Sequence, residues 1–110
     1  MPDSLHLIFA GSGEFGLPAL AGLIERGHQI VSVITQLDRP AGRGRAMTPT
    51  RSAAFAENQH LPLLKTANIN SESLPAADAM VVIAFGQKIA EPIVRHPRLG
   101  SINLHASLLP

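Results

Sequence analysis

Three polar residues late in the chain, Asn103, His105 and Ser107, alternate with apolar ones. Successive side chains of a strand point to opposite faces, so a strand here would project all three from one face. An amide N–H donor beside an imidazole is suited to stabilising an oxyanion and moving a proton during acyl-type transfer. Polar residues at a strand end also serve simply to satisfy turns, so the triplet alone leaves both interpretations open.

A second group of candidate functional residues is cationic. Four arginines lie within residues 39–51, with Asp38 as the nearest acid: Arg39, Arg43, Arg45 and Arg51. The guanidinium group binds phosphates through a planar fork of donors, and the glycines between these arginines let the backbone approach a ligand closely. Residues 36–50 have no apolar periodicity, which predicts a long loop. A loop of this length is typical of a functional segment, although a solvated basic loop is the other interpretation.

The third candidate is the glycine-rich stretch Gly11–Gly16, which spells G-x-G-x-x-G between a strand-like and a helix-like segment. This is the context of a dinucleotide-binding fingerprint. Pro18, however, delays the start of the helix, and Glu14 would place a carboxylate beside a pyrophosphate. Asp38 lies beyond the tip of the second strand, where the fingerprint expects an acid. A structural turn or a loop contacting another substrate is therefore favoured, with NAD-type binding as the alternative.

Composition excludes several classes of protein. The chain has 110 residues, a formal net charge of +1 and no cysteine, so it has no disulfide and no thiolate metal site. Its other four histidines have no metal-like spacing, and we expect no metal. The longest apolar runs are far below the roughly 20 residues of a membrane-spanning helix. The N-terminus lacks the basic region of a secretory signal, which predicts a cytoplasmic protein with no membrane partner.

Hydrophobic patterning predicts the elements that must position these residues. Apolar or alternating runs predict strands at residues 5–10, 29–35, 61–65, 79–85 and 100–106. Spacings of three and four predict a helix at residues 17–26. A short helix is expected at residues 51–59 and another helix at residues 87–96, where Pro92 limits its regularity, and residues 68–76 are polar and turn-rich. Strands interleaved with helices are typical of a Rossmann-like α/β fold, an open, mostly parallel sheet with helices on both faces.

The predicted sheet is incomplete at its C-terminal side. No covering helix follows the last predicted strand, whereas a parallel sheet needs both of its faces covered. We therefore expect residues 1–110 to form the N-terminal portion of a longer protein.

Three segments resemble one known family. Residues 102–110, INLHASLLP, resemble the I-N-x-H-x-S-L-L-P signature of the folate-dependent formyltransferases. Within that family, residues 35–45, TQLDRPAGRGR, are similar to the T-Q-P-D-R-P-A-G-R-G loop of the methionyl-tRNA formyltransferases. Phe9–Gly11, together with Glu14 and Phe15, resembles their F-A-G-T-P-E-F start. The three matches span almost the whole chain.

The resemblance implies roles for particular residues. Asn103 and His105 correspond to the catalytic pair, and the arginine loop corresponds to the insertion that holds the acceptor end of initiator tRNA. The segment that lines the folate pocket corresponds to Ser107, Leu108, Leu109 and Pro110. In the implied reaction, the α-amine of methionyl-tRNA attacks the formyl carbon of 10-formyltetrahydrofolate, while Asn103 and protonated His105 stabilise the oxyanion. The implied protein is a monomer that needs no metal or nucleotide cofactor.

The sequence also departs from the family pattern. The catalytic aspartate of the family follows the signature, so residues 1–110 do not include it, and we expect this fragment alone to be inactive. Gly13 and Gly16 replace the usual Pro and Ala, and Leu37 replaces a Pro. The departures leave other functions open: a folate-dependent formyltransferase for a small amine or a sugar nucleotide, an NAD-binding module, or a degenerate copy.

Overall fold

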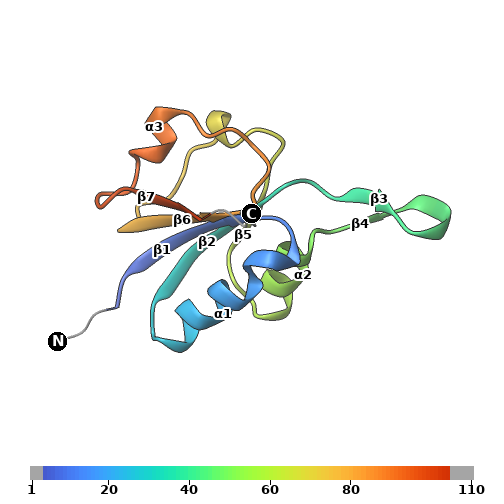
Figure 1. Ribbon diagram of the computed structural model, residues 1–110, viewed down its shortest axis with the longest axis horizontal. Coiled ribbons are helices and arrows are strands. Elements are labelled where there is room, and N and C mark those ends of the chain that lie inside the picture. The colour runs from blue at the N-terminus through green and yellow to red at the C-terminus, as the bar shows by residue number, and fades with distance from the viewer. Residues whose placement is uncertain (1–3, 105–110) are drawn as a thin grey trace, which may run out of the picture.

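The computed structural model describes residues 4–104, and its centre is a five-stranded sheet (Figure 1). The strands follow the order β5-β2-β1-β6-β7, and every neighbouring pair is parallel. Their bounds are β1 His6–Gly11, β2 Gln29–Thr35, β5 Leu63–Lys65, β6 Ala79–Ile83 and β7 Ser101–Leu104. The predicted Rossmann-like α/β class is confirmed.

Helices lie on both faces of the sheet, as predicted (Figure 1). On one face, α1 (Leu17–Glu25) and α2 (Arg51–Asn58) pack against β1 and β2. On the other face lie the short helix α3 (Glu91–Val94) and the 3₁₀ turn η3 (Ile69–Ser71). The apolar runs of β1 and β6 fill both cores because alternate side chains of a central strand enter opposite faces. The fully buried Ile69 shows that the segment predicted as polar and turn-rich also contributes to the core.

Helix α1 begins and ends where Pro18 and Gly27 predict. A 3₁₀ turn, η1 (Glu14–Gly16), precedes it, and Pro18 occupies its first turn, where a missing N–H costs little. It ends at Glu25 with Arg26 as its C-cap, and Gly27 follows with a φ of +91°, the left-handed conformation that closes many helices.

Residues 36–50 are not an irregular loop, and that prediction was wrong. They contain an antiparallel hairpin of two three-residue strands, β3 (Arg39–Ala41) and β4 (Ala46–Thr48), joined by the 3₁₀ turn η2 (Arg43–Arg45). The hairpin extends away from the body of the molecule (Figure 1). Every residue of both strands is exposed, so neither face carries the apolar alternation by which a strand is recognised in a sequence.

The helix predicted at residues 87–96 is also much shorter than expected. Only Glu91–Val94 is helical, because Pro92 lacks an N–H and its ring would clash with the carbonyl four residues earlier. A helix can therefore begin at Glu91 but cannot run through Pro92 from Gln87. The preceding strand β6 ends at Ile83, and the chain turns through Ala84 at a φ of +49° and Gly86 at a φ of +87°.

Strand β7 is the edge strand of the sheet within residues 4–104. Ile102 and Leu104 lie on its α1 side and are 55% and 48% exposed. Asn103 lies on its other side, and His105 and Ser107–Pro110 fall outside the described residues. None of the helices in the described part of the chain is long and apolar enough to cross a membrane.

Candidate functional site

The carboxyl ends of β1, β2, β6 and β7 meet at one edge of the sheet, where open α/β sheets bind ligands. The chain leaves β1 toward β2 on one side and later returns to β6 on the other, so the strand order reverses between β1 and β6. This switch point lies beside Ser12, which follows β1, and Ala84, which follows β6.

Asn103 opens onto a hollow on the α3 side of the sheet. It pairs with Val82 of β6 and so shares the face of Val82, which packs with Met80 in the core beneath α3. The hollow has a volume of about 300 Å³ and is lined by apolar side chains that include Ile89, together with Gln87 and Asn103. Its volume is at the lower end of the range for small-molecule sites. Asn103 is exposed, so its amide is available to a ligand.

A second hollow, of about 310 Å³, lies at the switch point itself. Ser12 and Gly13 form one side of it, and Arg39 and Thr50 lie at the base of the hairpin above it. Gln36 and the turn that follows β6, residues 84–86, form the remaining wall. Thr50 also caps α2, because its hydroxyl oxygen accepts a hydrogen bond from the N–H of Ala53 at 3.0 Å.

The structure separates the arginines of the basic segment. Arg39 lines the switch-point hollow, whereas Arg43 and Arg45 lie in the η2 turn at the tip of the hairpin and are exposed. An ion pair anchors the base of the hairpin: Lys65 Nζ donates to Asp38 Oδ1 at 2.8 Å. That hydrogen bond raises the pKa of Lys65.

The glycine-rich stretch does not have the geometry of a dinucleotide loop. A regular helix starts only at Leu17, so the second glycine does not stand at its N-terminus. A Cβ on Gly16 would lie 2.9 Å from the ring of Phe9, which shows that this glycine serves packing. A Cβ on Gly13 would meet nothing within 4 Å. The stretch is therefore a structural βα turn that borders the switch-point hollow, and this argues against the NAD alternative.

Sequence reasoning did not single out Gln36 and Gln87, yet the structure places both at this edge. Gln87 Nε2 donates to Gln36 Oε1 at 2.9 Å, and both side chains are half-buried. Gln36 stands directly after a strand, which could have marked it as a residue of the binding edge. No local signal in the sequence links it to a residue 51 positions away.

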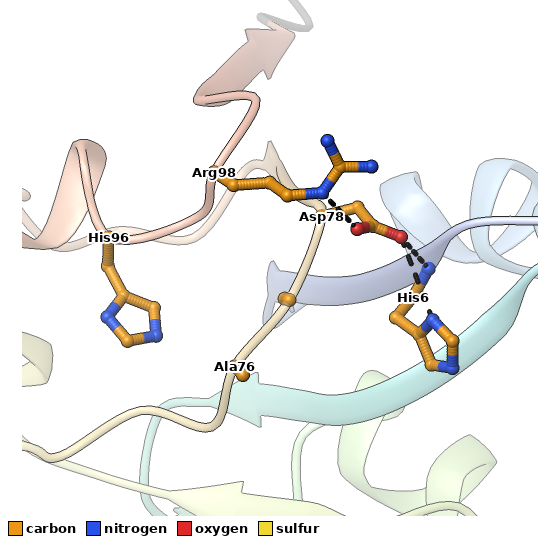
Figure 2. Close-up of a pocket in the computed structure, with 6 residues that line it drawn as sticks. His6, Ala76, Asp78, His96 and Arg98 are labelled. Carbon is orange, nitrogen blue, oxygen red and sulfur yellow. Dashed lines mark hydrogen bonds and ion pairs between the residues drawn. The ribbon is translucent and has the colours of Figure 1, made fainter.

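A larger hollow, of about 450 Å³, lies at the opposite edge of the sheet and is shown in Figure 2. There Asp78 accepts hydrogen bonds at 2.7 Å from the backbone N–H of His6 and from Arg98 Nε. The first of these bonds, with the second, holds the pKa of Asp78 below its usual range. His96 lies across the hollow, with its Nε2 2.7 Å from the carbonyl oxygen of Pro75. The Asp78 cluster joins β1, β6 and the segment before β7, which is a structural role.

No group of three potential metal-ligating side chains occurs within residues 4–104. The residues that line the two hollows at the edge carrying Asn103 include amide, hydroxyl and guanidinium side chains.

A comparison with known protein families agrees with this geometry. The family described as formyl transferase matches residues 5–110, nearly the whole chain. Members of this family are transferases that use folate-derived formyl donors. The parallel sheet and the exposed Asn103 amide at the carboxyl end of β7 agree with this match. The chain therefore belongs to the formyl transferase family.

Proposed function

We propose that residues 1–110 are the N-terminal portion of the catalytic domain of a methionyl-tRNA formyltransferase. The reaction is transfer of the formyl group of 10-formyltetrahydrofolate to the α-amine of initiator methionyl-tRNA, in the cytoplasm, at the start of translation. The observation that carries the proposal is the arginine hairpin, an exposed arm that starts beside the switch-point hollow and carries Arg43 and Arg45 at its tip.

The arm favours a large acceptor over a small one. A small amine or a sugar nucleotide would be held within the hollow, where Arg39 is available for a phosphate, and would not reach the hairpin tip. A tRNA acceptor end carries phosphates along an extended strand, and arginines held on an arm can contact several of them. Arg39, Arg43 and Arg45 are therefore assigned to tRNA binding.

Among the residues that the structure describes, Asn103 is the one that we assign to the chemistry. As the amine attacks the formyl carbon, negative charge develops on the formyl oxygen, and an amide N–H stabilises it best when already in place. Asn103 is fixed by its β7 backbone in register with Val82 and faces the 300 Å³ hollow. We assign the formyl end of 10-formyltetrahydrofolate to this hollow, whose mixture of apolar walls and amide groups suits a ring with donors and acceptors.

The remaining assignments rest on the signature in the sequence. His105 is the proposed partner of Asn103 in oxyanion stabilisation and proton movement, and Ser107–Pro110 the proposed folate segment. The proposal places the catalytic aspartate beyond residue 110, so the fragment alone is expected to be inactive.

The test is a formyl-transfer assay with the protein as its gene encodes it, 10-formyltetrahydrofolate as donor and a panel of acceptors. Initiator methionyl-tRNA should be formylated with a kcat/KM at least about 10²-fold above that of glycinamide ribonucleotide or an amino-sugar nucleotide, the scale expected when extended contacts define the substrate. A preference for one of the small acceptors would contradict methionyl-tRNA as the acceptor, but the protein would still be a formyltransferase. Transfer to none of them would refute the proposed function.

A further inference from the structure

A hydrogen-bonded cluster of three polar residues, Ser12, Gln36 and Gln87, ties together the carboxyl ends of β1, β2 and β6. The carbonyl oxygen of Phe85 accepts hydrogen bonds from Ser12 Oγ and from Gln36 Nε2, each at 3.2 Å. Ser12 Oγ in turn accepts the backbone N–H of Gln36 at 3.1 Å. The formyl-transfer chemistry proposed above uses none of these bonds.

The orientation of both glutamine amides follows from backbone groups that can only donate or only accept. Gln87 Oε1 accepts the N–H of Ile69 at 2.8 Å, and Gln87 Nε2 donates to the carbonyl of Thr66 at 2.9 Å. The second hydrogen of Gln87 Nε2 therefore points to Gln36 Oε1, which leaves Gln36 Nε2 facing the carbonyl of Phe85. Reversing either amide would place a donor against a donor or an acceptor against an acceptor, so the hydrogen bonds of the network have one possible direction.

The segment held by this network is the left-handed turn after β6. Ala84 has a φ of +49°, which a residue with a side chain adopts only when its surroundings impose it. Gly86 has a φ of +87°, and a Cβ there would lie 2.6 Å from Gln36 Nε2. Gln36 therefore occupies the space beside the turn as well as bonding to it.

The same turn borders a hollow on each of its sides. Residues 84–86 line the switch-point hollow with Arg39 and Thr50. They also line a hollow of about 210 Å³ with Asn103 and Gln87, next to the one assigned to the formyl donor. The turn thus stands between the side that carries the arginine arm and the side that carries Asn103.

We propose that Gln36 is a positioning residue that fixes the turn 84–86 as the partition between acceptor and donor. Because Gln36 directly follows β2 and the hairpin starts three residues later, it links the arm to this wall. The inference rests on the proposed function for what occupies each side. The physical basis is that small misplacements of groups that align two reactants cost large factors in rate.

The first test compares Gln36→Ala with Gln29→Ala in the protein as its gene encodes it. Gln29 is an exposed glutamine at the other end of β2 and serves as the matched control. Gln36→Ala should lower kcat about 10- to 10²-fold and raise the KM of both substrates, because the turn borders both hollows. Gln29→Ala should leave all three constants unchanged. The three-bond coupling between HN and Hα of Ala84, which reports its φ of +49°, should change in Gln36→Ala only.

A second variant, Gln36→Glu, distinguishes a role in positioning the turn from a general role in folding. Ionised, its carboxylate accepts from Gln87 but has no proton for the Phe85 carbonyl; protonated, it has one and restores both bonds. The Phe85 carbonyl oxygen can accept only from the protonated carboxyl and so raises its pKa above the free value of about 4.3. Activity relative to wild type should therefore rise as the pH falls from 8 toward 5. Gln36→Ala should show no such rise.

The outcomes separate this inference from the proposed function. An unchanged Ala84 coupling in Gln36→Ala, or a changed coupling with unaltered kinetics, would overturn the positioning role. A changed coupling with slower transfer supports it, as does the pH-dependent recovery of Gln36→Glu. A wild-type protein that transfers no formyl group would refute the proposed function, while the Ala84 coupling would still decide whether Gln36 holds the turn.

Discussion

At the residue scale, Asn103 is the described side chain on which the proposed chemistry depends. It projects from the α3 side of β7, in register with Val82, and is exposed to the hollow assigned to the formyl donor. Asn103→Ala should lower kcat about 10²- to 10³-fold with little change in the KM of either substrate, because an oxyanion donor acts mainly in the transition state. Steady-state kinetics on the intact protein check this.

The matched control for that prediction is Ser101→Ala, two positions earlier on the same face of β7. Ser101 Oγ donates to the carbonyl of Val94 at 2.7 Å and anchors the strand to α3. Its removal should lower thermal stability and leave kcat near the wild-type value. Equal kcat losses for Ser101→Ala and Asn103→Ala would show that the polar face of β7 acts through folding and not through an oxyanion.

Asp78 is the residue at which the fold should respond to acid. Its carboxylate accepts the N–H of His6 and Nε of Arg98, and these bonds lower its pKa. A carboxyl whose pKa is lower in the folded state stabilises fully above its unfolded pKa, about 3.9, and loses this contribution as the pH falls through the folded value. The melting temperature of wild type should therefore drop below about pH 4, and that of Asp78→Asn should be lower at pH 7 but less dependent on acid.

Glu91→Gln provides the comparison for Asp78→Asn. Glu91 pairs with Arg95 at 3.0 Å, but the side chain of Glu91 is 68% exposed and that of Arg95 is 77% exposed. Exposed pairs contribute little to stability, so this variant should melt like wild type across the same pH range. Identical pH profiles for Asp78→Asn and wild type would contradict the role assigned to the Asp78 cluster.

At the element scale, the hairpin β3–β4 is a separate structural unit, because both of its strands are exposed and its base is anchored by Lys65 and Asp38. Replacing Arg43 and Arg45 together with Ala should raise the KM for tRNA and reduce the slope of log affinity against log salt by about 1 to 2, since each lost phosphate contact contributes about 0.7. The KM for the folate donor should not change. Binding titrations at several salt concentrations measure the slope.

The control for the hairpin is the double variant Arg26→Ala and Arg95→Ala, which removes the same charge from the end of α1 and from α3. Long-range attraction alone would make both double variants equally weak, whereas contact by the arm predicts an effect of Arg43 and Arg45 only. An unchanged KM for tRNA in the hairpin variant would remove the main support for a tRNA acceptor.

At the scale of the whole molecule, the α1 side of the sheet is covered over β1 and β2 but exposes Ile102 and Leu104 on β7. Parallel sheets are normally covered on both faces. Residues 1–110 produced alone should therefore self-associate at high concentration, and the double variant Ile102→Thr and Leu104→Thr should reduce this. Sedimentation velocity measures the association, and Phe15→Ser, a single exposed apolar side chain elsewhere, is the control. A fragment that stays monomeric would count against the proposal that further chain covers this face.

Sequence patterns determined the central elements of this protein. The apolar runs of β1, β2 and β6 and the three-and-four spacing of α1 are signals carried by neighbouring residues, and the structure confirms them. The same patterns failed for β3 and β4, which bury nothing, and for residues 87–90, which Pro92 keeps out of the helix. The family match likewise follows from the sequence alone.

Only the tertiary structure decided what meets at the binding edge. Crossovers between parallel strands bring Ser12, Gln36 and Gln87 together, and their hydrogen bonds span up to 73 positions when the Phe85 carbonyl is included. The tertiary structure also divides the arginines, placing Arg39 at a hollow and the other two at the hairpin tip. The physical reason is that periodicity and capping depend on residues within a few positions. The partners of a polar side chain at a strand end depend instead on which distant strands the sheet places beside it.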